Sequence, residues 1–214
     1  MKKALSIVAA VLAVSAAGSA HAQSGPWYGG VSIGSAKSNV SAGEVNDYLR
    51  TLGFGSPSTS ADDKDTTYKF LLGYRFSPTI ALEGFYTDLG SYNTRSNVTN
   101  PFLGTVNAVY KAKGYGIDLV VSAPMSQVFS VYARLGIIQA KTEATFNSSG
   151  SIGLLFNRGS KNKTGQHYGV GLQYDITPAL GLRGEVETYR KLGDDSTGGE
   201  LKVDALSLGA ILRF

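Results

Sequence analysis

The last nine residues of the chain, 206–214, alternate between apolar side chains and side chains that are smaller or mostly more polar. The apolar positions are Leu206, Leu208, Ala210, Leu212 and Phe214. Because successive side chains of a strand point to opposite faces, this segment predicts a strand with one continuously apolar face that ends on an aromatic ring. Such a face is typical of a strand that meets lipid. A lone strand cannot satisfy its backbone hydrogen bonds in hydrocarbon, so the rest of the chain must supply a closed barrel.

The first 22 residues have the pattern of a secretory signal peptide. Lys2 and Lys3 precede an apolar run over 4–17, and Ala20-His-Ala22 forms a small-residue cleavage site. We therefore predict a signal peptide at 1–22 and one outer-membrane β-barrel domain at 23–214. Removal of the signal peptide would leave 192 of the 214 residues and lower the formal net charge from +4 to +2. Since no basic cluster is interleaved with aromatic residues, we expect no nucleic-acid binding.

Composition excludes several other classes of protein and of functional site. The chain has no cysteine, which excludes disulfides, thiol chemistry and thiolate metal sites. No apolar run after residue 22 approaches the roughly 20 residues of a membrane helix. Many of the 27 glycines fall inside apparent strands, where a narrow barrel needs small side chains on its inner wall.

Three hairpins with tight turns repeat the alternation seen at the end of the chain. With the first and last strands, the predicted set is 27–34, 66–76, 80–89, 110–123, 128–140, 167–176, 179–192 and 206–214. The fold we predict is all-β: an eight-stranded antiparallel transmembrane β-barrel of up-and-down topology, with short periplasmic turns and long extracellular loops. A soluble barrel would need an apolar interior, whereas here the charged residues share a face with the glycines.

The long polar segments are predicted as the loops. They are 37–65, 90–105, 141–163 and the shorter 193–200. In the first of them, Ser41 and Glu44 have capping-box spacing ahead of an apolar stripe, and Gly53 is a plausible stop, so we expect a short amphipathic helix at its tip.

Ionic side chains on the predicted inner wall are the main candidates for a functional site. By alternation, the lumen receives Lys69, Glu83, Asp118, Arg134, Arg183, Glu185 and Glu187, with Arg75, Asp175 and Arg213 near the periplasmic end. An eight-stranded barrel has an interior that side chains just fill. Unpaired charges there would be costly, so we expect opposite signs to pair across the interior.

Several segments, in order and spacing, resemble the transmembrane domain of the outer membrane protein A family and its small-barrel relatives, over nearly the whole length after residue 22. They include Trp27-Tyr-Gly-Gly, Leu72-Gly-Tyr-Arg-Phe, Leu82-Glu-Gly-Phe-Tyr, Tyr110-Lys-Ala-Lys-Gly, Val131-Tyr-Ala-Arg-Leu-Gly136, Tyr174-Asp-Ile-Thr-Pro178 and the last strand. We expect a monomer in the outer membrane of a Gram-negative bacterium, in contact with outer-membrane lipids and lipopolysaccharide. We expect the chain, which ends at Phe214, to lack the peptidoglycan-binding domain of full-length members.

The resemblance also assigns roles to residues. It implies that the last strand, with Leu208, Ala210, Leu212 and Phe214, is the signal read by the outer-membrane assembly machinery. It further implies that Glu83, Arg134 and Arg183 belong to a central ionic plug that can act as a gate, to which alternation adds Lys69, Asp118 and Glu185. Val120 and Gln173 stand where the family has a lysine and an acid. A static salt-bridge network and a switchable gate both remain open.

Enzyme chemistry finds little support. His167 is the one histidine after the signal peptide, and we expect it to point inward near the outer rim without a neighbouring serine. Glu185 and Glu187 are interpreted as charge partners, and the acidic residues at 62–65 lack a metal-ligand spacing. We therefore predict no catalytic residue, no cofactor and no metal site.

Apolar residues in the predicted loops are candidates for extracellular contact. They are Phe102, Leu103, Leu154, Leu155 and Phe156. Exposed apolar patches often mark contact surfaces, although these residues could equally pack on neighbouring loops. Three functions follow as hypotheses: a structural and adhesin-like surface protein that meets host, phage or neighbouring-cell ligands, a narrow gated pore of the porin type, and an outer-membrane lipid-modifying enzyme, the least favoured.

Overall fold

The computed structural model describes residues 25–39, 42–51, 53–55, 57–99, 103–150, 159–192 and 201–214. The predicted signal peptide at 1–22 and the predicted loop at 193–200 lie outside the described residues. The described elements are β1 (Trp27–Ser38), α2 (Ala42–Thr51), β2 (Ser58–Asp62), β3 (Lys64–Arg75), β4 (Ile80–Val98), β5 (Gly104–Pro124), β6 (Phe129–Gly150), β7 (Gly159–Asp175), β8 (Leu180–Arg190) and β9 (Val203–Arg213). Within these ranges no helix has the length and apolar character needed to cross a membrane.

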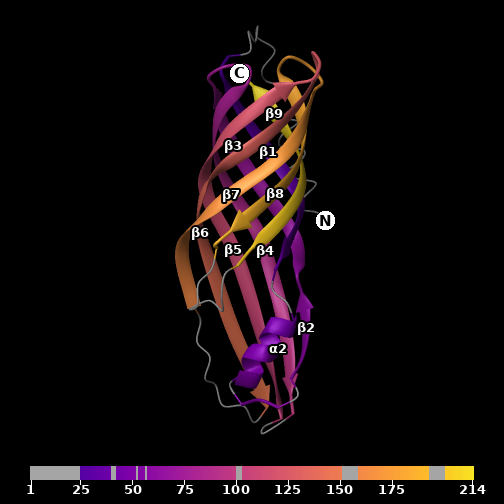
Figure 1. Cartoon of the computed structure of the whole chain (residues 1–214), viewed down its shortest axis with the longest axis vertical. Helices are drawn as coiled ribbons and strands as arrows, with labels where there is room; N and C mark the ends of the chain where they lie inside the picture. Colours follow the sequence, from indigo (N-terminus) through magenta and orange to yellow (C-terminus); the bar gives the residue numbers. More distant parts are fainter. Residues whose placement is uncertain are drawn as a thin grey trace.

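Eight of these strands close into an antiparallel barrel, which confirms the predicted fold (Figure 1). Each of β3 to β8 pairs with the next strand in sequence, and β9 pairs back with β1, where Val31 lies opposite Ala210. The same strand β1 pairs with β3 on its other side. The tight turns all lie at the end that holds the C-terminus, and α2 and β2 lie at the other end (Figure 1). Since the short turns of such barrels face the periplasm, α2 and β2 are extracellular.

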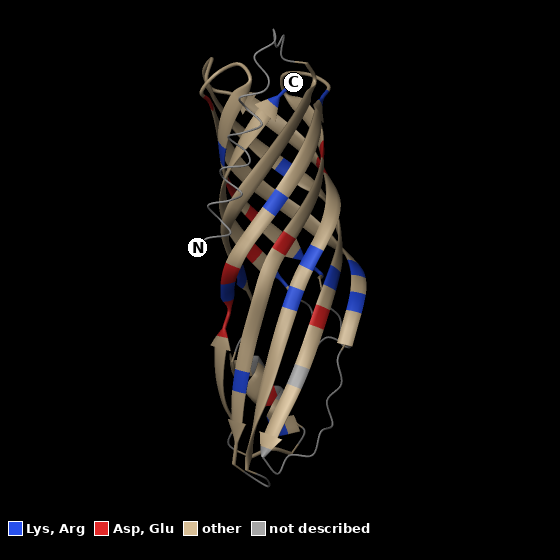
Figure 2. Ribbon diagram, turned by 180° about the vertical axis from the view of Figure 1, so that it is seen from behind, with Lys and Arg blue, Asp and Glu red and all other residues tan. Residues whose placement is uncertain are grey.

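The barrel is apolar outside and ionic inside. Leu208 on β9 is 72% exposed, and Leu72 on β3 and Ile137 on β6 are also largely exposed. Charged residues occur along the barrel strands as well as at the two ends (Figure 2). Because many of them are buried while large apolar side chains are exposed, the outer surface suits hydrocarbon rather than water.

Two apolar layers lie inside the barrel, one on each side of the buried charges. The extracellular layer includes Phe85, Leu89, Tyr92, Ile138 and Tyr189. The periplasmic layer consists of Tyr28, Ala81, Val120, Tyr132 and Ile211, with Leu71 packed against both layers. The interior is therefore filled by side chains at three successive levels, as expected for eight strands.

Two of the predicted long loops are largely strand, which corrects the expectation for 90–105 and 141–163. Strands β4 and β5 stay paired up to Val98 and Gly104, and β5 and β6 up to Gly104 and Gly150. Outward residues here meet water instead of lipid, so the apolar alternation that identified the membrane strands is lost while the hydrogen-bonded ladder continues.

A β-bulge explains why the sequence pattern broke at the start of the first extension. The register of β4 against β5 shifts between Asp88 and Ser91, and Gly90 takes a positive φ of 87°. Asp65 accepts hydrogen bonds from the backbone N (2.7 Å) and the hydroxyl of Ser91. As a result Leu89 and Tyr92, three residues apart, both point inward, which interrupts the period of two.

The predicted helix is confirmed as α2. Gly53, two residues after the end of α2, has a φ of 88° and donates from its backbone N to the carbonyl of Arg50, as a C-terminal glycine does. Leu49 of α2 is buried against Val98 of β4 and Val106 of β5. The short strand β2, which pairs with β4 beyond the end of β3, was not predicted. Its five residues, 58–62, are polar or small and lack a strand-like apolar face.

Candidate functional site: the central ionic cluster

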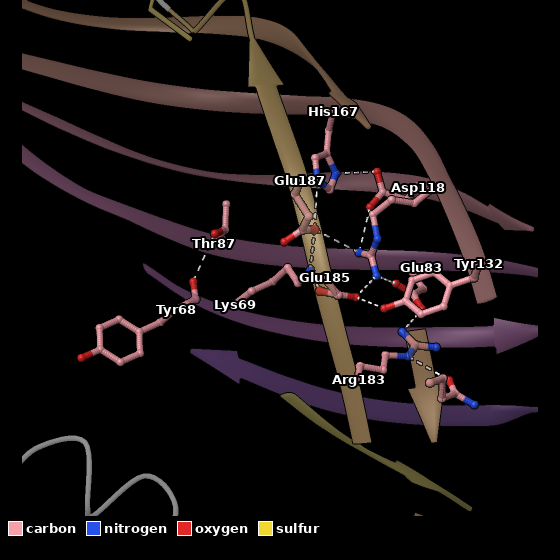
Figure 3. Close-up of polar contacts among 12 residues, drawn as sticks. Tyr68, Lys69, Glu83, Thr87, Asp118, Tyr132, His167, Arg183, Glu185 and Glu187 are labelled. Carbon is pink, nitrogen blue, oxygen red and sulfur yellow. Dashed lines mark hydrogen bonds and ion pairs between the residues drawn. The ribbon is translucent and has the colours of Figure 1, made fainter. Parts of the chain in front are cut away.

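A cluster of buried ionisable side chains fills the middle level of the barrel (Figure 3). We call it the central ionic cluster, and each member is at most 6% exposed: Lys69, Glu83, Asp118, Arg134, His167, Arg183, Glu185 and Glu187. They come from six strands, β3 to β8, so the cluster exists only when the barrel is closed. The structure places inside the barrel all six residues predicted as its ionic plug, and their role as a plug or gate stays a prediction.

Close packing around the cluster requires glycine at two positions. A Cβ at Gly73 would overlap the ring of Tyr28, and a Cβ at Gly171 would overlap the ring of Tyr132. Both tyrosines donate hydrogen bonds into the cluster, to Glu83 and to Glu185. The glycines on the inner wall therefore leave the room in which the charged side chains and their donors fit.

Glu83 joins the two arginines named by the family resemblance. Arg183 donates from Nη1 to Glu83 Oε1 at 2.6 Å, and Tyr28 donates to the same oxygen at 2.7 Å. The other carboxylate oxygen lies 3.3 Å from Arg134 Nη2. Arg183 also donates from Nε to Gln173 at 2.9 Å. The amide of Gln173 thus supplies an acceptor in place of the acid that the family has there.

Arg134 lies among four carboxylates. It donates to Glu185, and its guanidinium nitrogens lie 3.3 Å from Glu83, 3.4 Å from Asp118 and 3.5 Å from Glu187. Lys69 completes the group from β3, where its ammonium bonds to Glu185 and, at 2.6 Å, to Glu187. Val120, at the position where the family has a lysine, belongs to the periplasmic apolar layer.

His167 belongs to the central ionic cluster, which corrects its expected place near the outer rim. Its Nδ1 lies 2.8 Å from Asp118 Oδ1 and its Nε2 lies 3.1 Å from Glu187 Oε1. The ring is stacked on Tyr189, with centroids 4.2 Å apart, and packs against Phe85. Since the strands continue beyond the membrane, the rim lies farther from His167 than the predicted loop boundaries implied.

With all four acids ionised, the charges of the cluster balance if His167 is a cation. Three cations, Lys69, Arg134 and Arg183, face four carboxylates, those of Glu83, Asp118, Glu185 and Glu187. An imidazolium ring would donate from both nitrogens to the two carboxylates that flank it and make the numbers equal. The sequence could not reveal this role, because the partners of His167 lie on β5 and β8, 49 residues before it and 20 residues after it.

The remaining predicted site residues lie elsewhere. Leu208 and Phe214 are exposed on the outward face of the last strand, with Ala210 and Leu212 half-buried between them. Leu103, a contact candidate, is 73% exposed at the extracellular end. The other contact candidates, Phe102, Leu154, Leu155 and Phe156, lie outside the described residues.

An antiparallel barrel of eight membrane strands, apolar outside and closed by ion pairs inside, defines the class of small outer-membrane β-barrel proteins. Comparison with known sequences agrees with this class. Residues 6–214 match the family of the outer membrane protein beta-barrel domain, and the chain belongs to that family. It is a protein of the bacterial outer membrane.

Similar proteins include two outer membrane proteins A. The protein from Serratia marcescens is 29% identical over 217 residues, which cover 96% of this chain and 55% of that protein. The protein from Escherichia fergusonii is 28% identical over 146 residues, which cover 66% of this chain and 38% of that protein. The chain thus spans between 38% and 55% of the length of these two relatives.

Among solved structures, the crystal structure of Neisserial surface protein A has a TM-score of 0.54 and 13% sequence identity. The match covers 88% of this chain and 97% of that one. At this identity the likeness concerns the fold alone.

Proposed function

We propose that this protein acts at the cell surface, where its extracellular hairpins contact ligands on a host, a phage or a neighbouring cell. The observation that carries the proposal is the continuation of β4, β5 and β6 as paired strands well beyond the apolar band, to Val98, Gly104 and Gly150. An extended, hydrogen-bonded platform presents side chains in a fixed arrangement, which lowers the entropic cost of binding a partner.

Packing at the tip of the platform supports the same function. Helix α2 is held there by Leu49, Val98 and Val106, with Val45 and Phe54 packed against them, so the tip has a small apolar core of its own. The filled interior below also favours a scaffold role over bulk transport. In the membrane itself, the exposed apolar outer face makes outer-membrane lipids and lipopolysaccharide the surrounding partners. A closed barrel leaves no membrane edge to pair with another subunit, so we propose a monomer.

Shortening the first hairpin tests this function. Residues 93–109 would be replaced by a two-residue Asn-Gly turn joining Tyr92 to Tyr110, which are paired in the ladder. Binding of cells that display the wild-type or the shortened protein to epithelial cells and to immobilised matrix proteins would be compared at equal surface levels. The proposal expects binding to fall for the shortened protein. Unchanged binding would refute it for this hairpin.

The central ionic cluster favours a second candidate, a gated pore. Arg134 already lies within 3.5 Å of carboxylates on Glu83, Asp118 and Glu187 besides bonding to Glu185, so alternative partners are in place for a switch. Glu83→Ala would remove one partner of both Arg134 and Arg183. Current steps that appear in planar bilayers with this variant and not with Asp47→Asn, a change on the exposed face of α2, would support a gate. If neither variant produces current steps, the hypothesis of a gated pore is refuted.

A further inference from the structure

The periplasmic mouth of the barrel contains a polar cavity of about 170 Å3, which we call the mouth cavity. It lies beyond the periplasmic apolar layer, and its wall includes Arg75, Ser122, Ser130, Asp175 and Arg213. None of these five belongs to the central ionic cluster. Arg183 contributes to both, because its guanidinium lies between Glu83 and the cavity.

The cationic wall of the mouth cavity is only partly neutralised. Arg213 on β9 pairs with Asp175 at 2.6 Å and donates to the carbonyl of Pro178 at 2.9 Å, yet its Nε is buried without an acceptor. Arg75 on β3 lies with its Cζ 5.8 Å from the centre of the Tyr28 ring. Within the described part of the chain, the Arg75 side chain has no hydrogen bond and no ion pair.

Counting the charges that face the cavity leaves one cation unmatched. Arg213 is matched by Asp175, and Arg183 is matched by Glu83 from the interior side. Among the described residues that line the cavity, Asp175 is the one acid, so none remains for Arg75. A partly buried guanidinium with five donors and no acceptor, beside a second cation that has one carboxylate partner, is a site that lacks an anion.

The opposite wall offers hydroxyl groups. Ser122 on β5 and Ser130 on β6 line the cavity, and they lie four and three strands around the barrel from Arg213 on β9. Among the described residues neither hydroxyl makes a hydrogen bond. Guanidinium donors on one side and hydroxyl donors on the other match an anion that presents oxygens in several directions. A planar carboxylate would reach one wall, whereas a tetrahedral oxyanion would reach both.

We propose that the mouth cavity binds a phosphate group, held by the guanidinium of Arg75 on one side and by Ser122 and Ser130 on the other, with the buried cation of Arg213 beside it. Asp175 keeps Arg213 in place by its ion pair. The phosphate could come from free inorganic phosphate in the periplasm or from the headgroup of a phospholipid in the inner leaflet of the outer membrane.

The test is a titration followed by NMR. The refolded 23–214 barrel would be prepared in octyl glucoside, a detergent without phosphate, and titrated with sodium phosphate at constant ionic strength. Saturable shifts are expected for the Arg75 and Arg213 Nε–H signals and for the amides of Ser122 and Ser130. Arg75→Gln should weaken binding by roughly tenfold, the effect of losing a charge-assisted hydrogen bond. Shifts that grow without saturation, or an equal affinity for Arg75→Gln, would overturn the proposal.

Two controls complete the experiment. Lys111→Gln removes one exposed cation at the other end of the barrel and should leave the affinity unchanged, and an equal loss with this variant would mean only general charge attraction. A second titration with a soluble short-chain phosphatidylglycerol separates the sources of phosphate. Tighter saturation with this lipid assigns the site to a headgroup, and saturation by inorganic phosphate alone assigns it to the free ion. Dispersed spectra of each variant establish that its barrel is folded.

Discussion

Arg183 and Glu83 lie on opposite walls of the barrel, and their side chains meet inside it, with Nη1 donating to Oε1 at 2.6 Å. Strands β8 and β4 are separated by three strands in either direction around the closed sheet. The contact therefore reports closure of the whole barrel, since an open sheet would hold the two residues apart. Its energetic role is to satisfy charges that the narrow interior cannot hydrate.

Loss of Glu83 should be costly. Glu83→Gln would leave Arg183 and Arg134 with one carboxylate fewer in a fully buried setting, and we expect a loss of about 3–5 kcal/mol in the free energy of unfolding. Urea unfolding in phospholipid vesicles, followed by tryptophan fluorescence and electrophoretic mobility, measures it. Asp47→Asn on α2, where the pair with Arg50 is exposed, should change the free energy of unfolding by well under ~1 kcal/mol. If Glu83→Gln and Asp47→Asn lower the free energy of unfolding equally, the cluster has no special structural role.

Gly171→Ala should destabilise the barrel because the added Cβ would overlap the ring of Tyr132, which donates to Glu185. Overpacking of this kind costs roughly 1–3 kcal/mol. Gly84→Ala is the matched control, since it is also a strand glycine and its Cβ would meet nothing closer than the Leu72 carbonyl at 3.9 Å. The same unfolding assay compares the free energies of unfolding of the two variants. If Gly84→Ala is as unstable as Gly171→Ala, the loss does not come from overlap with the Tyr132 ring.

His167 should carry two protons. Both ring nitrogens lie within hydrogen-bond distance of carboxylate oxygens, 2.8 Å from Asp118 and 3.1 Å from Glu187, so both must donate for both contacts to be favourable. Nitrogen-15 shifts of the ring at neutral pH, in protein labelled at histidine, distinguish imidazolium from either neutral form. A neutral tautomer would contradict the charge balance inferred for the cluster and would place a proton on one of the acids instead.

Phe214 should matter for assembly more than for stability. Phe214 is 58% exposed directly after β9, in the segment where the family resemblance predicts a signal for the assembly machinery. We expect Phe214→Ala to lower the amount of folded protein in the outer membrane of cells while the purified barrel refolds into vesicles with almost unchanged stability. Phe76, 63% exposed in the tight turn between β3 and β4, supplies the control substitution Phe76→Ala. Equal losses in cells would argue against a special role for Phe214.

Much of this fold follows from a period of two in the sequence. Alternation placed Lys69, Glu83 and Arg134 on the inner wall because each lies in a strand whose other face meets lipid. Where the outer face of a strand meets water, its outward residues are polar and the alternation disappears. The sequence therefore predicts a loop where β4 continues to Val98. The bulge at Gly90 adds a residue that no period of two accommodates.

The partners within the site were less accessible to sequence reasoning. Pairing in the interior depends on which side chains lie at the same level across the barrel, and this is set by the stagger of all eight strands together. The contacts of His167 with Asp118 and Glu187 and the unmatched charge of Arg75 follow from that stagger. The sequence predicts ion pairs inside the barrel in general. Which side chain pairs with which is determined only by the folded barrel.

Single-channel recording of the wild-type barrel, refolded and inserted into a planar bilayer, shows whether the filled interior conducts ions. Side chains fill the interior at three levels, and we propose that the protein works through its extracellular surface. We therefore predict a flat baseline over the usual voltage range, with insertion verified independently by protection from added protease. Regular current steps of a stable open state in the wild-type protein would contradict this prediction.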